Sequence, residues 1–123
     1  MANKPRNQTL IAEAHAKLVS ARLYFHQAFA DAWDQIEANG ALTMDHKAHC
    51  QLATTNAVSA SAEAVRLVHG CVGTAGIRKD HQFEKYFRDV HVITQHAFVS
   101  EARLEAVGQV MFGLEPDWPF FAF

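Results

Sequence analysis

Apolar residues recur along this chain at steps of three and four, which is the spacing of an amphipathic helix rather than the alternation of a strand. The pattern predicts four helices, at about residues 9–38, 43–69, 81–98 and 100–112. We therefore expect an all-α fold, a bundle of four helices, in a domain that spans residues 9–113. A polar lead at residues 1–8 and an aromatic tail at residues 114–123 flank this domain.

The first helix carries an apolar stripe of the kind that packs against other helices in a bundle. The stripe consists of Ile11, Ala14, Leu18, Ala21, Phe25, Ala28 and Ala32, and it is widened by Phe29, Trp33 and Ile36. Asn39-Gly40 follows the stripe, and a glycine at this point predicts a left-handed cap that ends the helix.

The second helix is predicted to begin at Thr43, whose hydroxyl can cap free backbone N–H groups, with Asp45 in the positive first turn. From residue 53 to residue 64 it reads ATTNAVSASAEA, with small residues on nearly every face and almost no charge. A solvated helix would carry a polar face. We therefore expect this helix at the centre of the bundle, enclosed by its neighbours.

Two shorter helices complete the predicted bundle. The third has Glu84 four residues before Arg88, which is a stabilising spacing on a helix. The fourth is expected to start at a Ser100 cap and to stop at Gly113. The predicted inward residues are Phe83, Phe87, Val90, Ile93 and Ala97 in the third helix, and Leu104, Val107, Gly108 and Met111 in the fourth.

The tail LEPDWPFFAF contains one Trp and three Phe, and Pro116 and Pro119 exclude it from being a helix interior. Aromatic side chains bury on the order of 150–250 Å² each, so four of them are too much apolar area to leave in water. Either the tail folds back on its own bundle or it docks on a partner, and the sequence favours neither.

Charge and composition narrow the classes of function. The 123 residues include 11 basic and 13 acidic side chains, which are interspersed and give a net charge of −2. This balance argues against nucleic-acid binding through a basic surface. No apolar run approaches the roughly 20 residues of a membrane-spanning helix, and the N-terminus lacks the apolar core of a signal peptide. We expect a cytoplasmic protein without a membrane partner, in which Cys50 and Cys71 are free thiols.

Three polar features bear on chemistry, and each has an ordinary structural interpretation beside the functional one. The segment HKAHC at residues 46–50 approaches metal-ligand spacing, but no second pair complements it, so we predict surface histidines and no metal site. The segment GCVGTAG at residues 70–76 can cradle a phosphate or simply turn the chain between two helices. His96 lies near the edge of the third helix's apolar stripe, where most histidines are structural.

Three segments stand in an order and at a spacing that a generic bundle rarely provides. They are AEAVRLVHGCVGTAGI (62–77), FEKYFRDVHVITQHAF (83–98) and RLEAVGQVMFGLEPDWPFF (103–121). In these segments the chain resembles the C-terminal domain of the acyl-CoA dehydrogenase superfamily, over about residues 8–123. The resemblance implies an up-down four-helix bundle at the core of a homo-oligomer, a tetramer or a dimer, that helps to bind flavin across a subunit interface.

The resemblance also implies a cofactor and the residues that contact it. FAD is the expected flavin, with FMN as the alternative. Arg88 and Asp89 match the family's Arg-Asp pair, to which we assign a mainly structural role. The residues that match the family's flavin-contacting loop are Gly70, Gly73, Thr74 and Gly76.

Acyl-CoA dehydrogenases often place a catalytic glutamate after the Arg-Asp helix, where this chain has Ala97. Because that general base is missing, the chain looks more like the branch of flavin-dependent monooxygenases. These enzymes take reduced flavin from a separate flavin reductase and hydroxylate aromatic or heterocyclic substrates. His96 matches a histidine that faces the flavin in several relatives and is the candidate catalytic residue. His91 and Gln95 are weaker candidates, because one helix face cannot present all three.

Family enzymes precede this bundle with a helical domain and a β-domain, which hold most of the flavin and substrate contacts. We therefore expect the chain to be an isolated domain, a truncated product or a subunit completed by another polypeptide. The alternative function is a non-catalytic helical oligomerisation module, which the small-residue helix and the aromatic tail favour.

Overall fold

The computed structural model describes residues 2–122, and within these residues it contains helices and turns but no strand. The main helices are α1 (Pro5–Asn39), α2 (Met44–Val72), α3 (Gln82–Ile93) and α4 (Arg103–Met111), and two short 3-10 helices are η1 (Gly73–Ile77) and η2 (Pro119–Ala122). The predicted all-α class with four main helices is confirmed.

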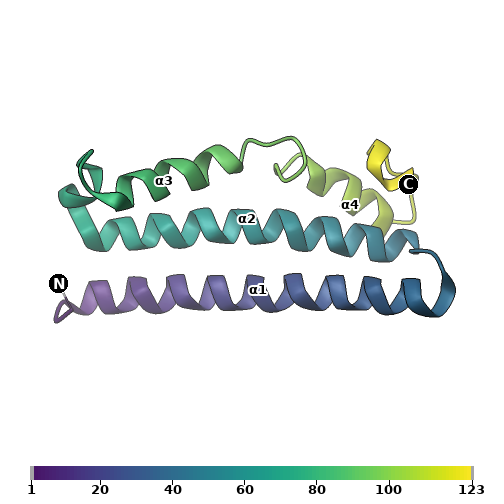
Figure 1. Ribbon diagram of the computed structural model, residues 1–123, viewed down its shortest axis with the longest axis horizontal. Coiled ribbons are helices and arrows are strands. Elements are labelled where there is room, and N and C mark those ends of the chain that lie inside the picture. Colours follow the sequence, from purple (N-terminus) through teal and green to yellow (C-terminus); the bar gives the residue numbers. More distant parts are fainter. Residues whose placement is uncertain (1, 123) are drawn as a thin grey trace.

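The four helices are arranged around α2. Figure 1 shows α1 and α2 side by side and antiparallel, with α3 and α4 following one another along the other side of α2. α2 contacts α1, α3 and α4, whereas α1 contacts neither α3 nor α4 within the described residues. The prediction that the second helix occupies the centre is therefore confirmed. The bundle is open, because α1 packs on a single helical neighbour.

Small side chains hold α1 against α2. Ala14 and Ala21 are buried on α1, and Ala53 and Ala64 are buried on α2. Because alanine has no atoms beyond Cβ, the two backbones can approach closely along this contact. Larger members of the predicted α1 stripe, such as Ile11, stay exposed beside it. The reason is that α3 and α4 lie beyond α2 and do not reach α1.

The ends of the two long helices are set by residues at or next to those ends. α1 begins at Pro5, four residues before the predicted start, with proline in the first turn, where its missing N–H costs nothing. It ends as predicted at Gly40, which is left-handed with φ 75°. The Thr43 hydroxyl accepts from the backbone N–H of His46, which confirms the predicted cap. α2 then continues to Val72, so the predicted glycine-rich loop begins inside the helix.

α3 and α4 are shorter than the sequence predicts. α3 ends at Ile93 rather than near residue 98. The Thr94 hydroxyl donates to the carbonyl of His91 at 2.6 Å, and the chain then passes through turns to α4. The prediction of a Ser100 cap is wrong, because α4 starts at Arg103 and Ser100 contributes its backbone carbonyl to the preceding turn.

The inward face of α4 also differs from the prediction. Val107 is buried as expected, but Leu104 and Met111 are exposed. Ala106 is buried beside Val107 instead, and this pair packs against Ala48 of α2. The rotation follows from the position of α4 on the flank of α2, where a narrow face of small residues makes the contact.

The tail folds back on its own bundle, which decides between the two alternatives that the sequence left open. Phe121 is buried against Ala48 and Val107, and its carbonyl accepts from Nζ of Lys47 at 2.9 Å. The guanidinium of Arg103 lies over the Trp118 ring, 3.8 Å from its centroid. Phe123, the last of the tail aromatics, lies outside the described residues.

Two further expectations concern the whole chain. Among the described residues, no helix combines the length and the apolar character that crossing a membrane requires. Cys50 and Cys71 are both free thiols, as predicted.

Candidate functional site

A cavity of about 480 Å³ lies beside the turns that connect α3 to α4. One wall is the side of α2, and the opposite wall is the end of α3 together with the turn that follows it. The lining residues are Thr55, Val58, Ser59, Ala62, Glu63 and Arg66 on α2, and His91, Thr94, Gln95, Val99, Ser100, Glu101 and Ala102 on the other wall.

The end of α3 presents a fixed row of polar groups to this cavity. His91 is half-buried, and its Nδ1 lies 2.6 Å from the carbonyl of Phe87. Because a carbonyl can only accept, Nδ1 carries the proton, and Nε2 of the neutral ring is left as an acceptor. Thr94 donates to the carbonyl of His91, and the Gln95 amide donates to the Thr94 hydroxyl at 3.1 Å. The row therefore offers an imidazole, a hydroxyl and an amide.

The α2 wall ties the turn in place and carries an ion pair. Thr55 is only 2% exposed, and its hydroxyl accepts from the Gln51 amide. The same amide donates to the carbonyl of Phe98 at 2.8 Å, so α2 holds the turn directly. Arg66 makes two hydrogen bonds to Glu63, and these bonds hold the pKa of the Glu63 carboxyl below its usual range.

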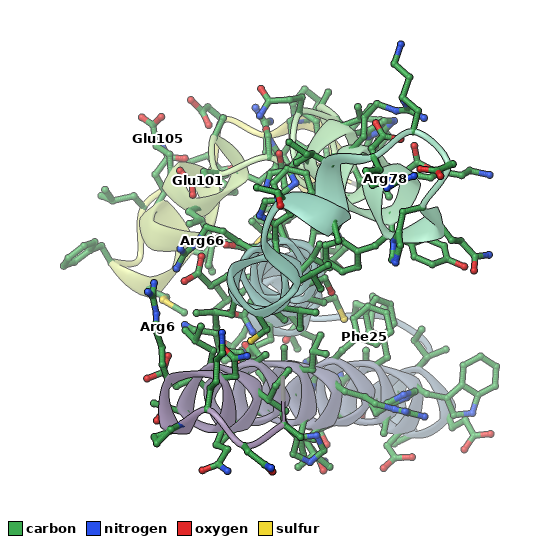
Figure 2. The ribbon with its side chains drawn as sticks, turned by 90° about the vertical axis from the view of Figure 1, so that its left-hand side faces the viewer. Arg6, Phe25, Arg66, Arg78, Glu101 and Glu105 are labelled. Carbon is green, nitrogen blue, oxygen red and sulfur yellow. The ribbon has the colours of Figure 1, made fainter. Side chains whose placement is uncertain are left out.

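The charged lining of this cavity lies on one side of the molecule. Figure 2 shows Arg66 and Glu101 on that side together with Arg6 and Glu105, whereas Phe25 and Arg78 lie on the other. The cavity with Arg66 and Glu101 on its lining therefore opens on the side opposite Phe25.

His96, the candidate catalytic residue, lies beside this cavity but does not line it. It is exposed in the turn after α3, where its Nδ1 accepts from the backbone N–H of Phe98 at 3.3 Å. In the neutral ring the proton is then on Nε2. The structure brings His91 and Gln95 to the cavity instead. These were the weaker candidates in the sequence, and their spacing of four residues is typical of one helix face.

The four predicted cofactor-contacting residues have different surroundings. Gly70 lies within α2, and Gly76 is buried where a Cβ would meet Val72 and His69 at 3.2 and 3.3 Å. Packing alone therefore accounts for the glycine at position 76. Gly73 has φ 64° with open space around it, and Thr74 is exposed beside it. These two residues face outward and are accessible to a ligand.

The glycine segment and the cavity are not brought together within the chain. η1 precedes α3, whereas the cavity lies at the far end of α3, and Figure 1 shows the length of that helix between them. A helix of 12 residues spans roughly 18 Å. One small ligand group cannot touch both places on a single copy of the chain.

A second cavity, of about 590 Å³, lies between α1 and the start of α2. The Tyr24 hydroxyl lies 2.8 Å from Nδ1 of His49, whose Nε2 lies 3.8 Å from the Asp45 carboxylate. His46 pairs with the Thr43 hydroxyl instead. The histidines of the 46–50 segment thus have separate partners, and the described residues include no group of three metal-ligating side chains.

Comparison with known proteins points to one family. Residues 1–101 match the family model for the acyl-CoA dehydrogenase C-terminal domain. An indole-3-acetate monooxygenase of Acinetobacter baumannii is 33% identical over 116 residues, and one of Pseudomonas putida is 30% identical over 116 residues. Each alignment covers 94% of this chain and 30% of the relative, so the chain spans less than a third of the length of these curated relatives.

Proposed function

Because the chain belongs to the acyl-CoA dehydrogenase family as a C-terminal domain, we propose that it is the helical module of a flavin-dependent monooxygenase. In this role it contributes part of a flavin site and oligomer contacts. The flavin is FAD, with FMN as the alternative, and a separate reductase delivers it in reduced form. The remaining flavin and substrate contacts come from domains that correspond to the other part of the relatives' length.

The α3–α4 junction is the observation that carries this proposal. Ala97 stands in an exposed turn there, at the position of the carboxylate that a dehydrogenase needs. The cavity beside it is lined by His91, Thr94 and Gln95. Both relatives are named monooxygenases, which supports oxygen incorporation over dehydrogenation.

The polar groups at this junction fit the edge of a flavin ring, which presents carbonyl oxygens and ring nitrogens. When bound, the flavin supplies the redox and oxygen chemistry. Nε2 of His91 accepts a hydrogen bond, and Nε2–H of His96 donates one, so the two rings offer opposite polarity on neighbouring turns. These histidines hold the ring edge or a substrate hydroxyl in position.

Gly73 and Thr74 serve a different part of the cofactor in this proposal. Their outward position, a helix length from the cavity, suits a flavin that is held mainly by another subunit. Gly70 and Gly76 have a packing role in this proposal. Gly70 lies against Leu10 and Gly76 against Val72, so the two glycines allow the segment to pack closely on its neighbours.

A flavin titration of the 123-residue chain tests the proposal. We expect saturable binding of FAD, followed by flavin fluorescence, and weaker binding of FMN. Thr74→Ala and His91→Ala should each weaken it by about tenfold, the effect of one lost polar contact of about 1.4 kcal/mol. His15→Ala on α1 is the matched control and should bind as the unchanged chain does. Absence of binding would contradict the flavin part of the proposal.

The monooxygenase part needs the complete enzyme. The chain is combined with domains that correspond to the rest of the relatives' length and is supplied with reduced flavin and oxygen. Indole-3-acetate, the compound in the relatives' names, is the first substrate to test. We expect oxygen incorporation that falls in His96→Ala. Oxidation of an acyl-CoA without oxygen incorporation would overturn this assignment.

A non-catalytic oligomerisation module remains the second candidate, because large apolar side chains are exposed along α1. This candidate predicts a stable oligomer that binds no flavin and adds nothing to catalysis beyond assembly. The same titration, with mass measured by light scattering, separates the two.

A further inference from the structure

Four aromatic side chains from α2 and α3 form a row between the glycine segment (residues 70–76) and the cavity at the end of α3. The ring of His69 packs against two rings of α3, with its centroid 6.0 Å from that of Phe83 and 4.7 Å from that of Phe87. The Phe87 centroid in turn lies 4.4 Å from that of His91. We name these four residues the ring row. It connects two places that one small ligand cannot touch together.

The ring row follows from the way in which α3 lies along α2 (Figure 1). Residues 83, 87 and 91 are spaced by four, so their side chains lie one above the other on one helix face. His69 stands in the last turn of α2, and its ring contacts two of the three. All four rings are partly buried. Because aromatic pairs attract one another beyond the area that they bury, the position of each ring constrains the next.

The glycine segment limits the space at one end of the row. Gly76 is buried, and a Cβ atom there would lie 3.3 Å from Cδ2 of His69 and 3.4 Å from Cδ1 of Phe83. It would also lie 3.2 Å from Cγ1 of Val72. In a close-packed interior such contacts are relieved by displacement of a neighbour. A side chain at position 76 would therefore push the His69 ring along the row.

The other end of the row lines the cavity. Nδ1 of His91 donates to the carbonyl of Phe87 at 2.6 Å, and the two rings lie against each other. Phe87 thus holds the imidazole by two contacts, one polar and one aromatic. These contacts select the rotamer and the tautomer in which Nε2 is left as the acceptor.

We propose that His69 is a positioning residue for His91. It acts through the Phe87 ring, which it holds against the imidazole, and so favours the Nδ1–H form of His91. The use of Nε2 toward a flavin or a substrate rests on the proposed function, whereas the orientation of the ring does not. A displacement in the glycine segment reaches the cavity by the same route, from Gly76 through His69.

Nitrogen NMR of the full 123-residue chain tests this role, with ¹⁵N-labelled histidine and no flavin present. The spectra are recorded at pH 8, above the range in which histidine ordinarily titrates, so that the shifts of the two ring nitrogens report the tautomer. The His91 signals are assigned by their loss in His91→Asn, and we expect mainly the Nδ1–H form. The ratio of Nδ1–H to Nε2–H should fall at least about twofold in His69→Leu, the low end of what one aromatic pair contributes.

Two further variants separate the role of the ring from a general effect on the fold. His69→Phe keeps an aromatic ring in the row and should leave the His91 ratio unchanged. Phe87→Leu removes the ring between the two histidines and should lower the ratio as His69→Leu does. Circular dichroism measures the helix content of each variant, and Phe87→Leu carries the test where His69→Leu loses helix.

The route from the glycine segment is tested by combining two substitutions. Gly76→Ala places a methyl group against His69 and should lower the His91 ratio. In the His69→Leu background it should cause no further fall, because the ring that carries the displacement is gone. Gly108→Ala on α4 is the control, since a Cβ there would meet no atom within 4 Å and the ratio should not change.

Several results would overturn the proposal. The first is a His91 that is mainly Nε2–H in the unchanged chain. The second is a ratio that neither His69→Leu nor Phe87→Leu changes, and the third is a fall in His69→Phe as large as that in His69→Leu. An equal effect of Gly76→Ala with and without the His69 ring would remove the route through His69.

The outcome is separable from the proposed function, because the spectra are recorded without flavin. A His91 ratio that responds as expected, in a chain that binds no flavin, would keep the positioning role and remove the flavin site. Flavin binding with an unresponsive ratio would do the reverse. With both in place, His69→Leu should weaken FAD binding by no more than His91→Ala does, and His69→Phe should leave it unchanged.

Discussion

Cys50 illustrates how packing of α1 on α2 changes the chemistry of a single side chain. Its thiol lies 3.6 Å from the carbonyl of Ala28 on α1. Burial raises the pKa of this thiol, and the nearby Asp31 carboxylate raises it further. Because the thiolate is the reactive form, the environment makes Cys50 less reactive than an ordinary surface cysteine.

The substitution Asp31→Asn should increase the reactivity of Cys50. Removing the carboxylate lowers the thiol pKa, so the rise of the alkylation rate with pH moves to lower pH. The measurement is the rate of iodoacetamide labelling against pH, in a Cys71→Ser background that leaves one thiol. Asp34→Asn removes a different charge from the same cavity and is the control. A profile that moves with Asp34→Asn and not with Asp31→Asn would contradict the assigned cause.

At the scale of helices, Thr43 and Ser100 form a natural comparison. Both read as helix caps in the sequence, and only Thr43 acts as one. Its hydroxyl accepts from the N–H of His46 at 3.2 Å. Ser100 instead precedes α4 by a turn in which its carbonyl accepts from Arg103.

Thr43→Ala should therefore lower the free energy of unfolding by about 1 kcal/mol, the usual value of a lost cap. Ser100→Ala should change it by less than about 0.5 kcal/mol, because no cap is removed. Urea unfolding followed by circular dichroism measures both, and an unchanged slope with urea would confirm that the folded and unfolded states remain comparable. Equal losses in the two variants would refute the assignment of the cap.

These helix ends mark the limit of prediction from the sequence. The ends at Gly40 and Thr43 were predictable, because a glycine or a hydroxyl acts on its own neighbours. The end of α3 at Ile93 was not, since the apolar spacing continues to Ala97. At the end of α3 the Thr94 hydroxyl bonds back to the carbonyl of His91. The turn that follows is held by Gln51 of α2, whose amide donates to the carbonyl of Phe98.

The candidate site was also predictable in part: its place in the chain could be predicted from the sequence, but the side chains that line it could not. The resemblance placed chemistry after the Arg-Asp pair, and the cavity does lie there, at the end of α3. It could not tell which side chains face the cavity, because the early end of α3 turns His96 outward and leaves His91 on the lining. The roles of these residues stay predictions that the titration will test.

On the scale of the whole molecule, periodicity reveals that a helix has an apolar face but not what covers that face. The predicted stripe of α1 is divided between alanines that contact α2 and larger residues such as Leu18 that remain exposed. α3 and α4 both lie beyond α2, and the described part of the tail packs against α2 and α4 and not against α1. The aromatic tail is therefore part of the fold, and its removal should be measurable.

Phe121→Ala should lower the free energy of unfolding by about 3 kcal/mol, because a buried phenylalanine is removed from contact with Ala48 and Val107. That is a large part of the total of about 5–15 kcal/mol for a domain of ordinary stability. Phe112→Ala is the matched control, since this phenylalanine is 85% exposed and its loss should change stability by less than about 0.5 kcal/mol. Urea unfolding compares the two variants, and limited proteolysis after Phe120 should accelerate only in Phe121→Ala. If both variants lost equally little stability and the tail resisted protease in each, the docking of the tail would not contribute to the fold in solution.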